Sequence, residues 1–140
     1  MTRAAAADCR IRAVALVATP SDAEAQTRAE YRGAGPAAIL GALAVYRFRG
    51  IDLEMERPLT FIASIAPRPV AIFAGTEDRT VPFEEGRELF AAARQPKEFH
   101  RIEHGDHGQY ARSDSTYAPA LRRFFASALA GPAATTECSR

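Results

Sequence analysis

The stretch that decides the fold is "PVAIFAGTEDRTVP", residues 69–82. Its first half is an almost unbroken apolar run that is too short for a buried helix. Such a run is typical of a strand that is covered on both faces. The run ends at Gly75 in a polar turn, and Pro82 suits the start of a following helix. The stretch therefore predicts a buried strand, a loop that carries Asp78, and a helix.

Two other segments have the character of strands. "IRAVALVA" (residues 11–18) is nearly continuous in its apolar residues. "KEFHRIEH" (residues 97–104) is more polar, with Phe99 and Ile102 as apolar positions, so we expect it nearer the edge of a sheet. With the run that ends at Gly75, these segments predict three parallel strands.

Helical patterns separate the strands. Ser21 followed by Glu24 forms a capping-box pattern, and Pro36 suits the first turn of the apolar segment that follows it. The last helix, over "YAPALRRFF" (residues 117–125) and a few residues beyond, could be capped by Ser113 or Ser115. The alternation of strands and helices predicts an α/β domain over residues 1–130, with an insert at 19–68 and a flexible tail at 131–140.

The composition argues against several function classes. Apolar residues make up 47% of the 140 residues, and the formal net charge of +1 comes without a basic stripe. We therefore expect a real core, and neither nucleic acid nor a membrane surface as partner. No run is long enough for a membrane-spanning helix, and the first 20 residues lack a signal-peptide pattern. Cys9 and Cys138 are expected to be unpaired thiols, and the chain to be cytoplasmic.

Two polar residues follow strands at what should be one edge of the sheet. Asp78 lies three residues after Gly75, and His107 lies three residues after His104. Ligands of open parallel sheets bind outside the carboxyl ends of the strands. A carboxylate there can orient an imidazole and stabilise its charged form, so that the imidazole acts as general base toward a hydroxyl or thiol.

Plainer interpretations stay open from the residues alone. Asp78 could simply form a turn, and His107 could be a surface histidine. His100 lies within the expected strand and His104 at its end, which favours structural roles for both. A metal site built from His104, Asp106 and His107 is conceivable, without a second ligand cluster to support it.

The segment "PRPVAIFAGTEDRTVPFEEGRELFAAARQPKEFHRIEHGDHGQY" (residues 67–110) resembles the C-terminal part of an α/β-hydrolase. The family pattern Gly-x-x-Asp-x-x-Val-Pro matches residues 75–82, and its Gly-x-His turn matches residues 105–107. The resemblance is close from about residue 65 to 129 and weaker over 11–20. It implies a partial α/β-hydrolase fold of about three parallel strands flanked by helices, with Asp78 as the triad acid and His107 as the general base.

The same resemblance implies a chemistry. Family members hydrolyse ester, thioester, amide or peptide bonds through a covalent acyl-enzyme intermediate, without a metal or organic cofactor. The expected partner is thus a small-molecule ester, thioester or peptide substrate. The insert at 19–68 corresponds to a region that often forms part of a lid or substrate wall. The sequence of the 66–82 segment most resembles the branch of dienelactone-hydrolase-like and prolyl-oligopeptidase-like proteins.

The nucleophile of the family pattern is missing from this sequence. In the family the serine lies in Gly-x-Ser-x-Gly, and neither cysteine and none of the serines has that setting: Ser21, Ser64, Ser113, Ser115, Ser127 and Ser139. We therefore expect the chain to start just after the family's serine and to have little or no esterase activity alone. The alternatives are an inactive truncated remnant, or one half of a split hydrolase whose exposed sheet edge binds a complementing N-terminal half or another copy.

Overall fold

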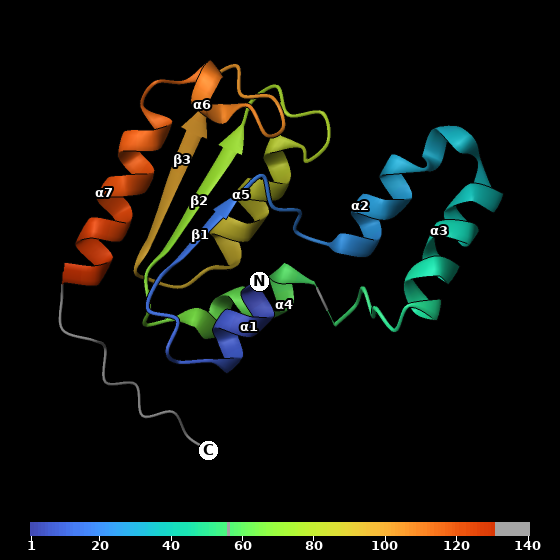
Figure 1. Ribbon diagram of the computed structural model, residues 1–140, viewed down its shortest axis with the longest axis horizontal. Coiled ribbons are helices and arrows are strands. Elements are labelled where there is room, and N and C mark those ends of the chain that lie inside the picture. Colours follow the sequence, from blue (N-terminus) through green and yellow to red (C-terminus); the bar gives the residue numbers. More distant parts are fainter. Residues whose placement is uncertain (56, 131–140) are drawn as a thin grey trace.

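The computed structural model describes residues 1–55 and 57–130. It centres on a parallel sheet of three strands in the order β1-β2-β3. The strands are β1 (Val14–Val17), β2 (Val70–Gly75) and β3 (Lys97–Ile102). The register aligns Val17 with Phe73 and Gly75 with Ile102, so the carboxyl ends of the strands meet at one edge (Figure 1). The predicted strands and their parallel direction are confirmed, although each strand is shorter than the sequence stretch that predicted it.

Helices surround this sheet and also extend away from it (Figure 1). In chain order they are α1 (Thr2–Ala7), α2 (Ala23–Glu30), the 3-10 turn η1 (Arg32–Ala34), α3 (Pro36–Phe48), α4 (Pro58–Ile62), the 3-10 turn η2 (Ala63–Ile65), α5 (Phe83–Ala92), α6 (Tyr110–Ser113) and α7 (Tyr117–Ala130). Pro36 and Pro58 each occupy the first turn of a helix, where the missing N–H of proline has no partner to lose.

The core lies on both faces of the sheet because the central strand β2 is buried along its whole length. Val70 and Ile72 belong to a cluster that includes residues of α1, α4 and α5. Ala71 and Phe73 point to the other face and join a cluster with residues of α6 and α7. This alternation explains the unbroken apolar run, because both sets of side chains need an apolar environment.

The segment between β1 and β2 forms an arm beside the sheet, made mainly of α2 and α3 (Figure 1). The two roots of this arm lie next to each other. The backbone N–H of Leu59 donates to the carbonyl of Ser21 over 3.2 Å, and Nε of Arg57 lies 2.9 Å from Oδ2 of Asp22. The apolar helix α3 buries none of its residues. The chain thus leaves the region of the sheet near Ser21 and returns to it near Leu59, and Ile62 and Ile65, which follow, belong to the core.

Two capping predictions are wrong. The N-cap of α2 is Asp22, whose carboxylate accepts from the backbone N–H groups of Glu24 and Ala25. Ser21 lies against α5 instead, where its hydroxyl donates to Oε2 of Glu88 over 2.8 Å. At the other end of the chain α7 begins at Tyr117, so the residue before it is Thr116 and not one of the two serines expected.

Cys9 is disulfide-bonded, so the expectation of an unpaired thiol at this position is wrong. An unpaired thiol at Cys9 therefore gives no support to the expected cytoplasmic location. Cys138 and the tail predicted at 131–140 lie outside the described residues. Across residues 1–55 and 57–130, no helix has the length and apolarity that crossing a membrane requires.

Candidate functional site

The structure brings Asp78 and His107 together at the carboxyl edge of the sheet. Asp78 lies in the loop between β2 and α5, and His107 lies in the loop between β3 and α6. Nδ1 of His107 is 3.1 Å from Oδ2 of Asp78. The Asp78 side chain is fully buried, whereas 42% of the His107 side chain is exposed. A buried carboxylate beside a half-exposed imidazole is compatible with general-base chemistry.

The carboxylate of Asp78 is held from two sides. Its Oδ1 accepts the backbone N–H groups of Thr80 and Val81 over 2.9 and 2.8 Å, an Asx-type turn that fixes the loop. Its Oδ2 accepts from the Tyr110 hydroxyl over 3.0 Å as well as from His107. Four hydrogen-bonding partners thus surround the buried carboxylate. With the carboxylate as acceptor, the contact fits the tautomer of His107 that carries its proton on Nδ1.

Tyr110 is a site residue that sequence reasoning missed. It is 3% exposed, and its hydroxyl also accepts the backbone N–H of Gly75 over 2.9 Å. Burial, followed by the hydrogen bond with Asp78, raises the pKa of Tyr110 well above its ordinary value. The sequence signal that could have found Tyr110 is its place only three residues after His107, at the start of the short helix α6.

The two loops approach so closely because glycines meet between them. A Cβ atom on Gly75 would lie 2.7 Å from Cε1 of Tyr110 and would collide with the backbone oxygen of Gly105. A Cβ atom on Gly105 would lie 3.0 Å from the Cα atom of Gly75. The N–H of Glu77 donates to the carbonyl of Gly105 over 3.1 Å across this contact. Both glycines of the family pattern are therefore required by close backbone approach.

A second histidine–carboxylate pair lies on the surface beside the first. Nδ1 of His104 is 2.6 Å from Oε1 of Glu77, and both side chains are exposed. The hydrogen bond with Glu77 raises the pKa of His104 above its usual value. The backbone of His104 has a positive φ of 54°, and its N–H donates to Oγ1 of Thr76 over 2.9 Å. This pair links the same two loops, which agrees with the structural role expected of His104.

His100 is also structural, as expected, because its ring stacks on Phe73 with centroids 4.4 Å apart. The conceivable metal site is not assembled. Among the described residues, no group of three or more His, Cys, Asp or Glu side chains could hold a metal ion.

No nucleophile accompanies the pair within the described part of the chain. The hydrogen bonds among residues 1–55 and 57–130 include none that joins Nε2 of His107 to a serine or threonine hydroxyl. Ser21, which lies between β1 and α2, donates its hydroxyl proton to Glu88 instead. Within the described residues, the arrangement thus pairs a buried carboxylate with an imidazole whose second ring nitrogen meets no serine or threonine hydroxyl.

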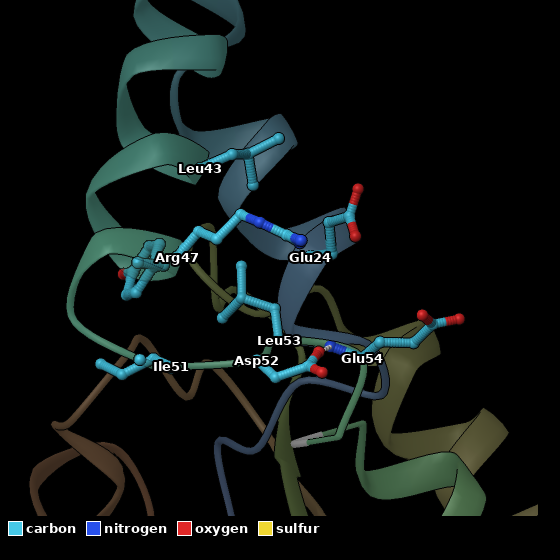
Figure 2. A pocket seen from close by; sticks show the side chains of 9 residues that line it. Glu24, Leu43, Arg47, Ile51, Asp52, Leu53 and Glu54 are labelled. Carbon is cyan, nitrogen blue, oxygen red and sulfur yellow. Dashed lines mark hydrogen bonds between the residues drawn. The ribbon is translucent and has the colours of Figure 1, made fainter.

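An open hollow of about 580 Å³ lies beside the pair, lined by Thr76, Glu77, Asp78, Arg79 and Asp106. Another, of about 440 Å³, belongs to the arm and is lined by none of the loop residues just described. Figure 2 shows Arg47 of α3 extending across this second hollow toward Glu24 of α2, with Leu53 of the segment 51–54 below it. Of these two hollows, the first is the one that contacts the candidate site.

Comparison with curated proteins finds similarity to an uncharacterized protein, YfhR, of Salmonella typhimurium. The two are 40% identical over 73 residues, which is 49% of this chain and 24% of the relative. The YfhR protein of Salmonella typhi gives the same identity and the same shares. The chain thus spans about a quarter of the length of these relatives. No protein-family model matches the chain.

Solved structures resemble the chain over most of its length. The α/β-hydrolase GrgF from Penicillium sp. sh18 has a TM-score of 0.64 at 17% identity, over 93% of this chain and 60% of that one. The DcsB complex with its substrate analogue has a TM-score of 0.63 at 19% identity, over 93% and 61%. The esterase domain of a Rhodothermus marinus protein has a TM-score of 0.57 at 20% identity, over 88% and 56%. With three parallel strands flanked by helices and these neighbours, the chain has the fold of an α/β-hydrolase, of which it spans about 60%.

Proposed function

We propose that this chain carries the acid and the general base of a serine hydrolase that acts on ester, thioester or peptide bonds. The observation that carries the proposal is the hydrogen bond from Nδ1 of His107 to the buried Oδ2 of Asp78, at the carboxyl edge of a parallel sheet. Acid before histidine in the chain is the order of α/β-hydrolase triads. The hydrolase fold of the structural neighbours supports the same reaction class.

In this mechanism His107 moves protons and Asp78 stays ionised. Because Nδ1 holds a proton toward Asp78, the lone pair of Nε2 can accept the hydroxyl proton of a serine as its oxygen attacks the carbonyl carbon of the substrate. Asp78 stabilises the imidazolium that forms. The imidazolium then returns the proton to the leaving group, which leaves an acyl-serine. Water, activated by the same imidazole, releases the acid product.

This machinery also needs a serine nucleophile and oxyanion donors, and no serine hydroxyl among residues 1–55 and 57–130 is hydrogen-bonded to Nε2 of His107. We propose that they come from polypeptide that completes the sheet beside β1, either joined to residue 1 or as a separate chain. This is supported by the sheet order, in which β2 occupies one edge of β1 and no described strand occupies the other.

The second candidate is a chain without catalytic activity. Its support is the lack of any hydroxyl at Nε2 of His107 within the described residues. Under this alternative Asp78 and His107 retain their geometry and serve only to fix the two loops.

The test is hydrolysis of a p-nitrophenyl acyl ester by the full chain, alone and co-expressed with polypeptide encoded directly upstream. We expect no activity above background alone, and activity upon co-expression. His107→Ala and Asp78→Asn should each lower the restored kcat/KM by about 10³-fold or more. The matched control His104→Ala removes the neighbouring exposed imidazole. The restored kcat/KM of this variant should stay within about twofold of that of the unmodified pair.

The outcomes separate the candidates. Restored activity that falls in both site variants and persists in the control supports the hydrolase. Activity that is unchanged in His107→Ala removes the assignment of the base. A co-expressed pair that binds but does not hydrolyse the ester or a thioester favours the inactive chain.

A further inference from the structure

We propose that Tyr110 is a positioning residue of this site, whose hydroxyl holds the Asp78 carboxylate in the orientation in which Oδ2 accepts the Nδ1 proton of His107. The inference rests on the proposed roles of Asp78 and His107. It adds a third side chain that acts through the acid and does not touch the reacting atoms.

The two oxygens of Asp78 are held in different ways. Oδ1 is bound by two backbone N–H groups of its own loop. Oδ2, the oxygen that faces His107, has one other donor, the Tyr110 hydroxyl at 3.0 Å. Rotation of the carboxylate about its Cβ–Cγ bond would move both oxygens, and would therefore strain the two bonds to Oδ1 and break the contact with Tyr110. Tyr110 is the donor that holds Oδ2 itself, on the side of the carboxylate that faces His107.

Tyr110 is more rigidly held than His107, which suits it to fix the orientation of the Asp78 carboxylate. It is 3% exposed, whereas 42% of the His107 side chain is open to solvent. Its ring packs edge-on against Tyr117, with centroids 5.9 Å apart. Packing thus fixes Tyr110, which holds the carboxylate, whereas His107, which exchanges protons, stays accessible to solvent.

The hydroxyl is also oriented by its second partner. The backbone N–H of Gly75, at the end of β2, donates to the phenolic oxygen over 2.9 Å. This bond uses a lone pair of the oxygen and leaves its proton for Asp78. Gly75, Tyr110 and Asp78 thus form a chain of two hydrogen bonds, from the end of the central strand to the acid. Burial keeps the hydroxyl protonated, since it raises the pKa of Tyr110.

The experiment is a measurement of the His107 tautomer by ¹⁵N NMR on the full chain, at a pH at which the imidazole is neutral. Three variants are compared with the unmodified protein. Tyr110→Phe removes only the hydroxyl, and Asp78→Asn removes the acceptor charge. Tyr117→Phe is the matched control, because it removes the hydroxyl of the ring that packs against Tyr110. A tautomer readout does not depend on a nucleophile.

We expect the ratio of Nδ1–H to Nε2–H tautomer of His107 to fall about tenfold in Tyr110→Phe and further in Asp78→Asn. The ratio in Tyr117→Phe should stay within about twofold of the unmodified protein. A ratio that falls in Asp78→Asn but not in Tyr110→Phe overturns the role of Tyr110 and leaves the proposed function standing. A ratio that changes in neither variant overturns the acid–base pair and the Tyr110 role with it.

A second measurement covers the case in which Tyr110→Phe does not fold. In the unmodified chain, the Tyr110 hydroxyl proton and the Nδ1 proton of His107 are both hydrogen-bonded to Oδ2 of Asp78. These two protons must therefore lie close together. A nuclear Overhauser contact between these two protons supports the proposal. A detectable Nδ1 proton without that contact overturns it.

Discussion

Gly75 shows how a single missing side chain allows the two site loops to meet. Any Cβ atom there would collide with the backbone of Gly105 and press on the ring of Tyr110. We therefore expect Gly75→Ala to lower the free energy of unfolding by about 2–4 kcal/mol, since neither neighbour is a flexible chain end. Urea denaturation of the full chain measures this. Gly33→Ala is the control, with no atom within 4 Å of the added methyl, and should change stability by less than about 0.5 kcal/mol. Equal effects in the two variants would contradict the close approach.

At the scale of elements, the root of the arm is tied to α5 through carboxylates. Oε2 of Glu85 accepts the N–H of Ser21 over 2.9 Å, and Glu88 accepts its hydroxyl proton. Burial, opposed by the hydrogen bond from Ser21 and assisted by the charges of Glu88 and Asp22, raises the pKa of Glu85 above its usual 4.5. The folded chain therefore holds this proton to higher pH than the unfolded chain does. The stability that results is present in full below about pH 4.5 and is lost as pH rises through the folded pKa.

This linkage predicts a specific change in Glu85→Gln, which cannot titrate. We expect the decline in unfolding free energy between pH 4.5 and 7 to be shallower in this variant than in the unmodified chain, as measured by urea denaturation at several pH values. Glu84→Gln is the matched control, because Glu84 lies in the same helical turn but pairs on the surface with Arg87. Identical pH profiles for the Glu85 variant and the unmodified chain would show that Glu85 is not protonated by folding.

At the scale of the whole molecule, the arm and the sheet leave apolar surface uncovered. Leu40, Val45 and Phe48 of α3 are 66%, 56% and 94% exposed, and one edge of β1 pairs with no described strand. Exposed apolar patches and bare edges favour association. We expect the full chain to self-associate at micromolar concentration, and Leu40→Lys with Phe48→Lys to shift it toward monomer in sedimentation velocity. Leu129→Lys on α7, which is 49% exposed, is the control and should have a smaller effect. A sharp monomer at all concentrations would contradict this expectation.

The sequence alone determined the elements whose cause is local. Apolar runs 69–75 and 11–18 predicted strands, and Pro36 marked a helix start, because burial on both faces and the geometry of proline act within a few residues. The order of strands and helices then predicted parallel pairing. The same order placed Asp78 and His107 at one edge, and the 3.1 Å contact between them agrees with that placement.

Only the tertiary structure decided which partners these residues have. Ser21 fits a capping pattern in sequence, yet its hydroxyl binds Glu88, 67 residues away. In the sequence, Tyr110 is an aromatic residue with no evident polar partner. Folding brings its hydroxyl between the backbone N–H of Gly75 and the carboxylate of Asp78. Periodicity reports which side of an element is buried. It does not report which polar atom a buried side chain meets, because that depends on loops that approach one another only after the sheet has formed.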